Sequence, residues 1–188
     1  MSLKFGNGSS LGLEQVFVPK KRSDDSPGHS FQHLRPKETR FIISLKRKLT
    51  PRVLLKPKFK LNIAHHKTSY KPDLKLPVRV TDRFTIEPGY KFKWSHYSGV
   101  DKDDKRKREP FIALVYRMGV FKLELRRTQI WAGHKMYNDR RRDYENKLKL
   151  KYALTANFTL FADARDVTAS STDSRRQLKS KLGFEYAF

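Results

Sequence analysis

Apolar and polar side chains alternate through the last part of the chain, from residue 178 to the final residue, Phe188. One parity carries the apolar residues Leu178, Leu182, Phe184, Tyr186 and Phe188. The other parity carries Lys179, Lys181 and Glu185. Because successive side chains of a β-strand point to opposite faces, this pattern predicts a strand with one apolar and one charged face.

The composition limits how the chain can fold. Its 188 residues predict a single domain over 1–188. Hydrophobic residues make up 37%, and the mean hydropathy of −0.75 leaves no apolar run long enough for a transmembrane helix. A barrel strand, in contrast, needs only about 9–11 residues and is half polar. Cysteine is absent, which excludes disulfides and thiolate metal sites.

The same alternation recurs along the whole chain. We expect an all-β, antiparallel up-and-down transmembrane barrel of about ten strands, with eight as an alternative. The expected strands are 10–19, 40–49, 52–65, 73–80, 83–95, 109–118, 120–133, 145–154, 157–166 and 176–188.

Short turns and long polar segments alternate between these strands. Leu49–Val53, Val80–Phe84 and Leu154–Phe158 resemble one another and predict tight turns, with Met118-Gly119 as a fourth. The polar segments are 20–38, 66–72, 97–108, 134–144 and 167–175. We expect 20–38 to be a flexible basic loop and 97–108 and 134–144 to be long basic loops. All short turns then lie at one end of the barrel and all long loops at the other.

The polar face of the predicted strands is strongly basic, in a chain of formal net charge +23. If the apolar face meets lipid, this face lines a lumen and forms a path for anions. The expected lumen-lining residues are Lys46, Lys48, Lys56, Lys58, Lys60, Lys91, Lys93, Lys122, Arg126, Lys147, Lys149, Lys151, Lys179 and Lys181.

A soluble basic β-domain remains an alternative, because any antiparallel sheet can bury one face and expose the other. Pro57, Pro77 and Pro88 favour it, since proline removes a hydrogen bond from a central strand. Strand 109–118 is apolar on both faces, which suggests contact with a plug or a partner.

The segment Leu154–Arg165 followed by Leu178–Phe188 resembles the last hairpin and closing strand of bacterial-type outer-membrane proteins. The resemblance implies an insertion signal made of Leu182, Gly183, Phe184, Tyr186 and Phe188. The positive charge, and an amino terminus without an apolar signal segment, favour insertion from the cytosol. The chain is thus most similar to small chloroplast outer-envelope pore proteins. The implied location is the plastid outer envelope, with mitochondrial or bacterial outer membranes as alternatives.

Three functions are consistent with these features. A lumen rich in lysine and arginine predicts an anion-selective pore for phosphorylated metabolites or inorganic anions. A barrel this small also fits a non-conducting accessory subunit of an envelope complex, such as a protein-import translocon. A soluble RNA-binding β-protein is a minor alternative based on the pI near 10.3, although nucleic-acid signature motifs are missing. The expected partners are membrane lipids and anionic solutes.

Patterns typical of enzymes, metal sites and cofactor sites are missing from the sequence. No glycine-rich phosphate loop occurs. His65 and His66 are adjacent in a predicted strand, so they point to opposite faces and cannot chelate together. We therefore expect no catalytic residue, no metal and no cofactor.

Overall fold

The computed structural model describes residues 2–19, 34–99, 103–136, 140–169 and 175–186. All regular structure in these ranges is β-strand. The long strands are β2 (Ser9–Pro19), β3 (Leu34–Leu45), β5 (Leu54–Ala64), β6 (Lys67–Lys75), β8 (Phe84–Tyr97), β9 (Lys105–Met118), β10 (Phe121–Ala132), β11 (Arg142–Ala153), β12 (Phe158–Thr168) and β13 (Arg176–Tyr186). The short strands are β1 (Ser2–Lys4), β4 (Arg47–Lys48) and β7 (Val78–Arg79).

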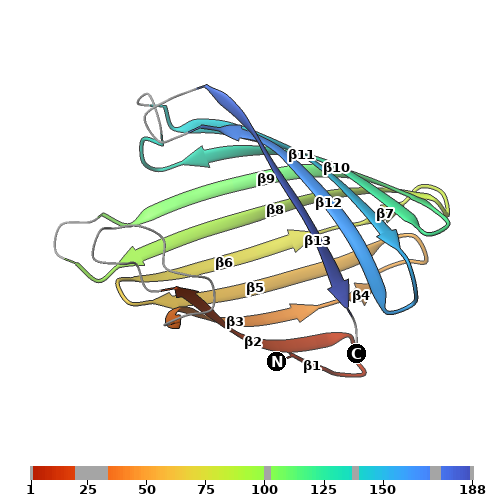
Figure 1. The fold of residues 1–188 in the computed structure, drawn as a ribbon, viewed down its shortest axis with the longest axis horizontal. Helices are drawn as coiled ribbons and strands as arrows, with labels where there is room; N and C mark the ends of the chain where they lie inside the picture. Colours follow the sequence, from red (N-terminus) through yellow and green to blue (C-terminus); the bar gives the residue numbers. More distant parts are fainter. Residues whose placement is uncertain (1, 20–33, 100–102, 137–139, 170–174, 187–188) are drawn as a thin grey trace.

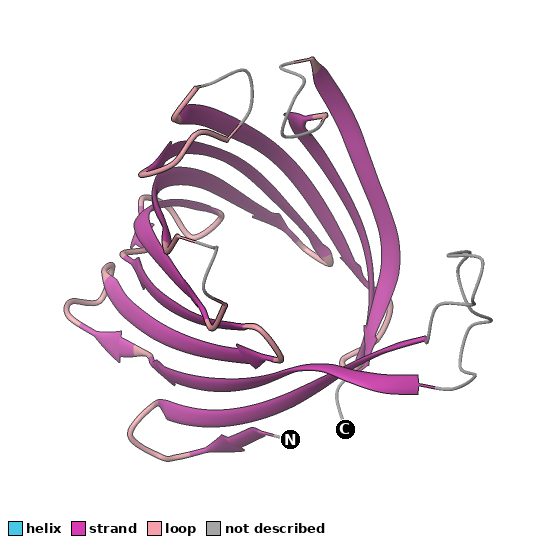
Figure 2. Ribbon diagram, turned by 90° about the vertical axis from the view of Figure 1, so that its left-hand side faces the viewer, coloured by secondary structure: helices cyan, strands magenta, loops and turns pink. Residues whose placement is uncertain are grey.

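The strands form one up-and-down sheet, and neighbouring strands in the described ranges pair antiparallel. The order is β1-β2-β3-β5-β6-β8-β9-β10-β11-β12-β13, while β4 pairs with β5 and β7 pairs with β8. Figure 1 shows the long strands side by side, and Figure 2 shows that the sheet curves into a barrel around a central space. None of the described residues belongs to a helix that is long and apolar enough to cross a membrane.

Three of the tight turns share one hydrogen-bonding pattern. Thr50, Thr81 and Thr155 each accept, through the side-chain hydroxyl, a hydrogen bond from the backbone N–H three residues later, at 3.0–3.1 Å. The backbone N–H just before each threonine donates to the carbonyl that closes the turn, at 2.9–3.0 Å. Threonine favours such turns because its hydroxyl replaces a backbone partner. The fourth turn uses Gly119, which has a φ of 54° that other residues rarely adopt.

Burial in this barrel is inverted relative to a soluble protein. The buried polar residues, among them Asn62, Ser69, Ser95 and Asp163, face the inside. Large apolar side chains cover the outside, where Ile43 is 55% exposed and Leu182 is 81% exposed. A continuous apolar outer surface of this kind is stable against hydrocarbon and not against water. The structure therefore removes the main argument for a soluble domain.

Strand β9 is the exception, since its segment from Pro110 to Tyr116 is apolar on both faces. Its inward residues Phe111, Ala113 and Val115 are buried, with Ala113 fully so. The ring of Phe111 is covered by cations rather than by a plug, with Arg126 at 4.5 Å and Lys91 at 5.1 Å from its centroid. The suggested contact with a plug or partner is therefore not needed to explain this strand.

Two glycines make room for aromatic rings on the inner face. A side-chain carbon at Gly89 would lie 2.2 Å from the Phe111 ring and 2.7 Å from the backbone oxygen of Leu74. At Gly183 the nearest atom would be the tip of the Phe161 ring, at 2.6 Å. Each glycine sits directly opposite its aromatic residue in the antiparallel register. Aromatic side chains that cover glycines in this way restore packing on a bare stretch of backbone.

The ten expected strands correspond to the ten long strands of the structure. The expected ends were wrong at several places, because polar residues were assigned to loops. Residues 34–38 belong to β3, and the remainder of the expected loop 20–38 lies outside the described residues. The expected loop 66–72 is mostly β6, so the connection there is only 65–66. In the expected loops 97–108 and 134–144, the described residues include the start of β9 at Lys105 and of β11 at Arg142.

We predict that Gly89→Ala destabilises the barrel by about 1–3 kcal/mol, the usual cost of overpacking. The backbone oxygen of Leu74 cannot move away without disturbing β6. Gly183→Ala should cost less, because only the end of the Phe161 ring must turn. The free energy of unfolding in detergent, from denaturant titration, measures both effects. Gly6→Ala, with no atom within 4 Å of the new carbon, is the control; equal stability of all three variants would contradict the packing.

We also predict that a nitroxide at Leu150 lies in lipid and that one at Lys151 lies in water. The two side chains are neighbours on β11 and point to opposite faces. The chain contains no cysteine, so Leu150→Cys and Lys151→Cys each give a single labelling site. In bilayers, oxygen should relax the first label and a water-soluble nickel complex the second. Protection of the Leu150 label from both reagents would indicate burial beneath protein.

Candidate functional site

The inner face of β5, β6 and β8 carries a wall of lysines at alternating positions. Lys56, Lys58 and Lys60 lie on β5, Lys71 and Lys75 on β6, and Lys91 and Lys93 on β8. The register places Lys56 opposite Lys75 and Lys60 opposite Lys71. Like charges directly opposite each other destabilise a sheet. We call these seven residues the lysine wall.

Most of the lysine wall has no carboxylate partner. Lys75 is 3.4 Å from Glu87. Among the described residues, no carboxylate lies within ion-pair distance of the other wall members, namely Lys56, Lys58, Lys60, Lys71, Lys91 and Lys93. Asp73 and Glu109 lie in the same region, but at longer range. The wall therefore carries an excess of positive charge on the inside of the barrel. Because the barrel and the surrounding lipid have a low dielectric constant, this charge attracts anions.

The opposite side of the barrel is different, because its cations are paired. Lys147 on β11 is 2.9 Å from Asp163, which Arg165 also contacts at 2.8 Å. Lys149 and Lys151 both pair with Glu185 of β13. Asp163 is only 5% exposed. These four cations share two carboxylates, so the pairs lower the local positive field without cancelling it, and the inside of the barrel has one side of mostly unpaired lysines and one paired side.

Three cavities follow the inner face along β5, β6, β8 and β9. The cavity at the short-turn end has about 500 Å³ and is lined by Lys46, Lys48, Lys56, Lys122 and Arg126, among others. The middle one has about 210 Å³ and is lined by Lys58, Lys60, Lys91 and Lys93, with Lys71, Asp73 and Glu109. The third, at the long-loop end, has about 290 Å³ and is also basic. Together they place cations along the length of the barrel interior.

Two acidic residues that line the short-turn cavity, Glu87 and Glu124, form one cluster with Arg126. Arg126 contacts Glu124 at 2.9 Å and Glu87 at 3.3 Å. Glu87 also contacts Lys75. The Arg126 guanidinium lies at the same time over the ring of Phe111. This cluster fixes the long side chain of Arg126 in one position, so Arg126 is less able to follow a moving solute than the unpaired lysines.

The expected lumen residues thus separate into two groups. Those on β5, β8 and β10, together with Lys46 and Lys48, line the cavities. Those on β11 and β13 lie on the paired side, where Lys179 and Lys181 belong to the exposed end strand. Sequence reasoning missed several cavity residues because it assigned them to loops, namely Lys67, Lys71, Lys105 and Lys107. Their parity was the available signal: Lys67 and Lys71 alternate in register with Lys75, and Lys107 with Phe111.

The residues expected to form the insertion signal lie in β13. Leu182, Phe184 and Tyr186 are on its outer face, and all are more than half exposed. Gly183 is on the inner face beneath Phe161. Their high exposure has a simple cause, since β13 is the last strand in the sheet order and, among the described residues, pairs only with β12. Phe188 lies outside the described residues.

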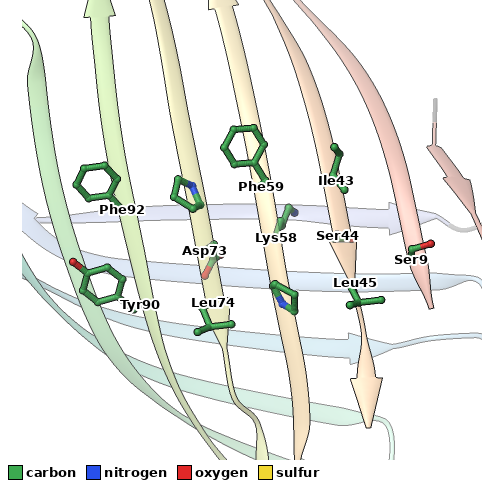
Figure 3. Close-up of a pocket in the computed structure, with 12 residues that line it drawn as sticks. Ser9, Ile43, Ser44, Leu45, Lys58, Phe59, Asp73, Leu74, Tyr90 and Phe92 are labelled. Carbon is green, nitrogen blue, oxygen red and sulfur yellow. The ribbon is translucent and has the colours of Figure 1, made fainter. Parts of the chain in front are cut away.

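A mainly apolar groove of about 610 Å³ lies on the outer face, and Lys58 and Asp73 also contribute to its lining. Figure 3 shows Phe59, Leu74, Tyr90 and Phe92 on neighbouring strands, and Pro57 and Pro72 also line the groove. Each proline lacks the N–H that a ladder hydrogen bond requires, so the surface is indented there. The groove is part of the apolar outer surface and contributes no charge to the inside.

Close to the long-loop end, one carboxylate ties an outer-face tryptophan to the segment before β9. The indole of Trp94 donates a 2.9 Å hydrogen bond to Asp104, and the His96 ring contacts the same carboxylate at 2.8 Å. The bond from Trp94, with a further contribution from His96, lowers the pKa of Asp104 below its ordinary value. Among the described residues no cluster of three or more metal-ligating side chains is placed to hold a metal ion.

Known proteins resemble this chain over its full length. The sequence profile of the family described as "Oligogalacturonate-specific porin protein (KdgM)" matches residues 1–188. The "Oligogalacturonate-specific porin KdgM" of Dickeya dadantii (strain 3937) is 23% identical over 199 residues, covering 100% of this chain and 82% of that protein. An "Uncharacterized protein YiiY" of Salmonella typhimurium is 21% identical, covering 100% of this chain and 81% of that protein.

Solved structures share the fold. "NanC porin structure in rhombohedral crystal form" superposes with a TM-score of 0.73 at 14% identity, covering 100% of this chain and 90% of that chain. "KdgM porin" gives a TM-score of 0.63 at 17% identity, covering 100% and 89%. Both superpositions show that this chain shares its barrel fold with these two proteins.

These matches correct the expected location. The sequence pointed to the chloroplast outer envelope, but the relatives are bacterial, and the bacterial outer membrane that was kept as an alternative is the one that fits. The positive net charge favours the wrong location because it reflects the residues that line the barrel interior and not the membrane in which the barrel lies. The chain belongs to the KdgM family of bacterial outer-membrane porins.

Proposed function

We propose that this porin is an anion-selective pore whose solutes are acidic oligosaccharides, with carboxylates that move along the lysine wall. The observation that carries the proposal is the wall itself. Six lysines on three adjacent strands face the inside without a carboxylate at ion-pair distance among the described residues. Rings and rows of lysine and arginine are the usual selectivity device of anion pores.

The arrangement of the wall suits a chain of charges better than a single ion. Lysines at alternating positions of one strand are about 7 Å apart, and the wall continues across three strands. A solute with several carboxylates can exchange one lysine for the next without crossing a region free of positive charge. Each contact is weak because the lysines are partly hydrated, and conduction requires binding that is also easy to release.

The paired side of the barrel, formed by β11, β12 and β13, supports the same function. Because Lys147, Lys149 and Lys151 are held by Asp163 and Glu185, they offer less charge to a passing anion. A solute is then drawn to one side of the barrel, where the apolar and hydroxyl groups of its sugar rings can face the paired side. Attraction on every side would hold the solute too tightly to pass.

Relatives add a substrate class to the electrostatic argument. The curated relative from Dickeya is named an oligogalacturonate-specific porin, and one solved relative, with a TM-score of 0.65, is described in complex with disordered oligogalacturonate. Oligogalacturonate is a linear polyanion, which is the kind of solute that the lysine wall would attract. Phosphorylated metabolites and inorganic anions share its charge but not its length, so they are the competing solutes.

We predict that the pore prefers anions and that the variant Lys56→Gln/Lys58→Gln/Lys60→Gln reduces this preference. Each charge attracts an anion and repels a cation by roughly 0.4 kcal/mol at ~10 Å in water, so removing three should lower the anion-to-cation permeability ratio by more than about tenfold. The reversal potential across planar bilayers in a salt gradient measures this ratio.

The matched control is Lys37→Gln/Arg47→Gln/Arg83→Gln, which removes the same charge from exposed positions that line none of the three cavities. Equal effects of the two triple variants would mean that net charge, and not the wall, sets selectivity. Cation preference in the unmodified protein would refute the proposal. A folded barrel with no conductance would support the accessory-subunit function instead.

We predict further that trigalacturonate at low salt reduces the small-ion current, whereas a neutral trisaccharide of the same length does not. The reduction should weaken in 1 M salt, where the Debye length falls to about 3 Å. Lys91→Gln/Lys93→Gln should weaken it as well, while Lys37→Gln/Arg47→Gln should leave it unchanged. Stronger reduction by glucose 6-phosphate than by trigalacturonate would assign the pore to phosphorylated metabolites.

A further inference from the structure

The cavity at the long-loop end differs from the other two in its lining. It has about 290 Å³ and is bounded by Lys67, Lys93, Lys105, Lys107 and His134, which we call the entrance cluster. Ser95, Tyr97, Lys135 and Met136 complete the lining. In the described ranges no carboxylate lines it, whereas Asp73 and Glu109 line the middle cavity and Glu87 and Glu124 line the short-turn cavity.

Backbone hydrogen bonds hold His134 in place over this cavity. Gly133 donates to the carbonyl of Arg106 on β9 at 2.9 Å, and Met136 donates to the carbonyl of Arg140 at 2.8 Å. The segment that carries His134 is therefore attached to β9 on one side of the ring and bonded to the segment before β11 on the other. The Nδ1 atom of His134 is buried and has no hydrogen-bond partner in the part of the chain that the structure describes.

A buried ring nitrogen without a partner is costly, and so is a group of ammonium ions without a counterion. Lys93 and Lys107 lie directly opposite each other in the β8–β9 register. Tyr97 offers only a weak partner, with Lys67 at 5.2 Å and Lys105 at 5.9 Å from its ring centroid. Below them, Ser69 and Ser95 use their hydroxyls on each other, at 3.0 Å. One bound anion would satisfy both the lysines and the histidine.

Among the described residues that line the cavity, every charged group around His134 is positive. These are Lys67 on β6, Lys93 on β8, Lys105 and Lys107 on β9, and Lys135 beside it. The nearest cavity-lining carboxylate, Glu109, belongs to the middle cavity and acts on Lys93. Partial burial, and then repulsion from Lys107, Lys105 and Lys93, lower the pKa of His134 below its ordinary value. The ring is therefore neutral near pH 7.

We propose that the entrance cluster is a binding site for a compact oxyanion, such as a carboxylate or a phosphate, and that His134 takes up a proton when the anion binds. The four lysines supply charge at every physiological pH. His134 supplies the pH dependence: once protonated, its Nδ1–H donates a hydrogen bond to the anion, and the anion in turn stabilises the imidazolium.

The sign of the effect follows from linkage. The anion raises the pKa of His134, so the bound state holds its proton at a higher pH than the free state does. Affinity is constant above the bound-state pKa. It increases by about tenfold per pH unit as the pH falls between the two pKa values, and it is constant again below the free-state pKa. The site therefore captures anions more strongly on the acidic side.

This inference builds on the proposed function, since the natural ligand would be a terminal carboxylate of the same acidic solute. The two can fail separately. Loss of anion preference in bilayers would leave binding at the entrance cluster intact, and a silent His134 would leave the anion preference of the lysine wall intact.

The test measures sulfate binding to the full chain in detergent by calorimetry, from pH 8 to pH 5. Sulfate is the probe because its own charge does not change in this range. We expect the affinity of the unmodified protein to increase as the pH falls and the affinity of His134→Asn to stay flat. Lys107→Gln should weaken binding at every pH and move the dependence to higher pH, because one repulsive charge on His134 is gone.

A second readout follows the histidine directly. The imidazole carbon resonance that is absent from the spectrum of His134→Asn should titrate at higher pH when sulfate is present. Unchanged titration, or the same pH dependence of affinity in His134→Asn, would overturn the proposal, as would absence of sulfate binding to the folded barrel. Monogalacturonate and inorganic phosphate, compared at one fixed pH, then show which oxyanion the site prefers. Heat-modifiable mobility on gels verifies that each variant is folded.

Discussion

The structure depends on one constraint: the backbone hydrogen bonds of the strands must be satisfied within the sheet, because the side chains around them face hydrocarbon. Antiparallel pairing from β1 to β13 provides these bonds and gives the sheet its barrel shape. Alternation then sends most apolar side chains outward and most polar ones inward. The inverted burial, the threonine turns and the basic interior all follow from this arrangement.

Charged side chains on the inside of such a barrel are costly unless carboxylates of the protein or bound anions pair with them. The protein uses both solutions, on different sides. Asp163 and Glu185 pair with the lysines of β11, and Glu87 and Glu124 pair with Arg126 at the short-turn end. The wall on β5, β6 and β8 and the entrance cluster remain without carboxylate partners at ion-pair distance among the described residues. Solute anions are the partners that would complete them.

Local sequence predicted the elements well and their ends poorly. Alternation identified all ten long strands, and the repeated Thr-containing segments identified three turns that the hydrogen bonds of Thr50, Thr81 and Thr155 explain. The polar composition around Lys67, Lys71 and Lys105 predicts loops, whereas these residues belong to β6 and β9. Polar residues fit equally well in a loop and on the inner face of a strand, so composition could not separate the two cases.

Sequence by itself determined which side chains share a face, because parity along a strand is a local property of the chain. It could not decide which lysines meet a carboxylate. Lys151 and Glu185 are 34 residues apart, and Arg126 and Glu87 are 39 apart, so their contacts depend on which strands pair and in which register. Only the tertiary structure, through that pairing, divided one basic face into a side whose cations meet carboxylates and a side open to anions.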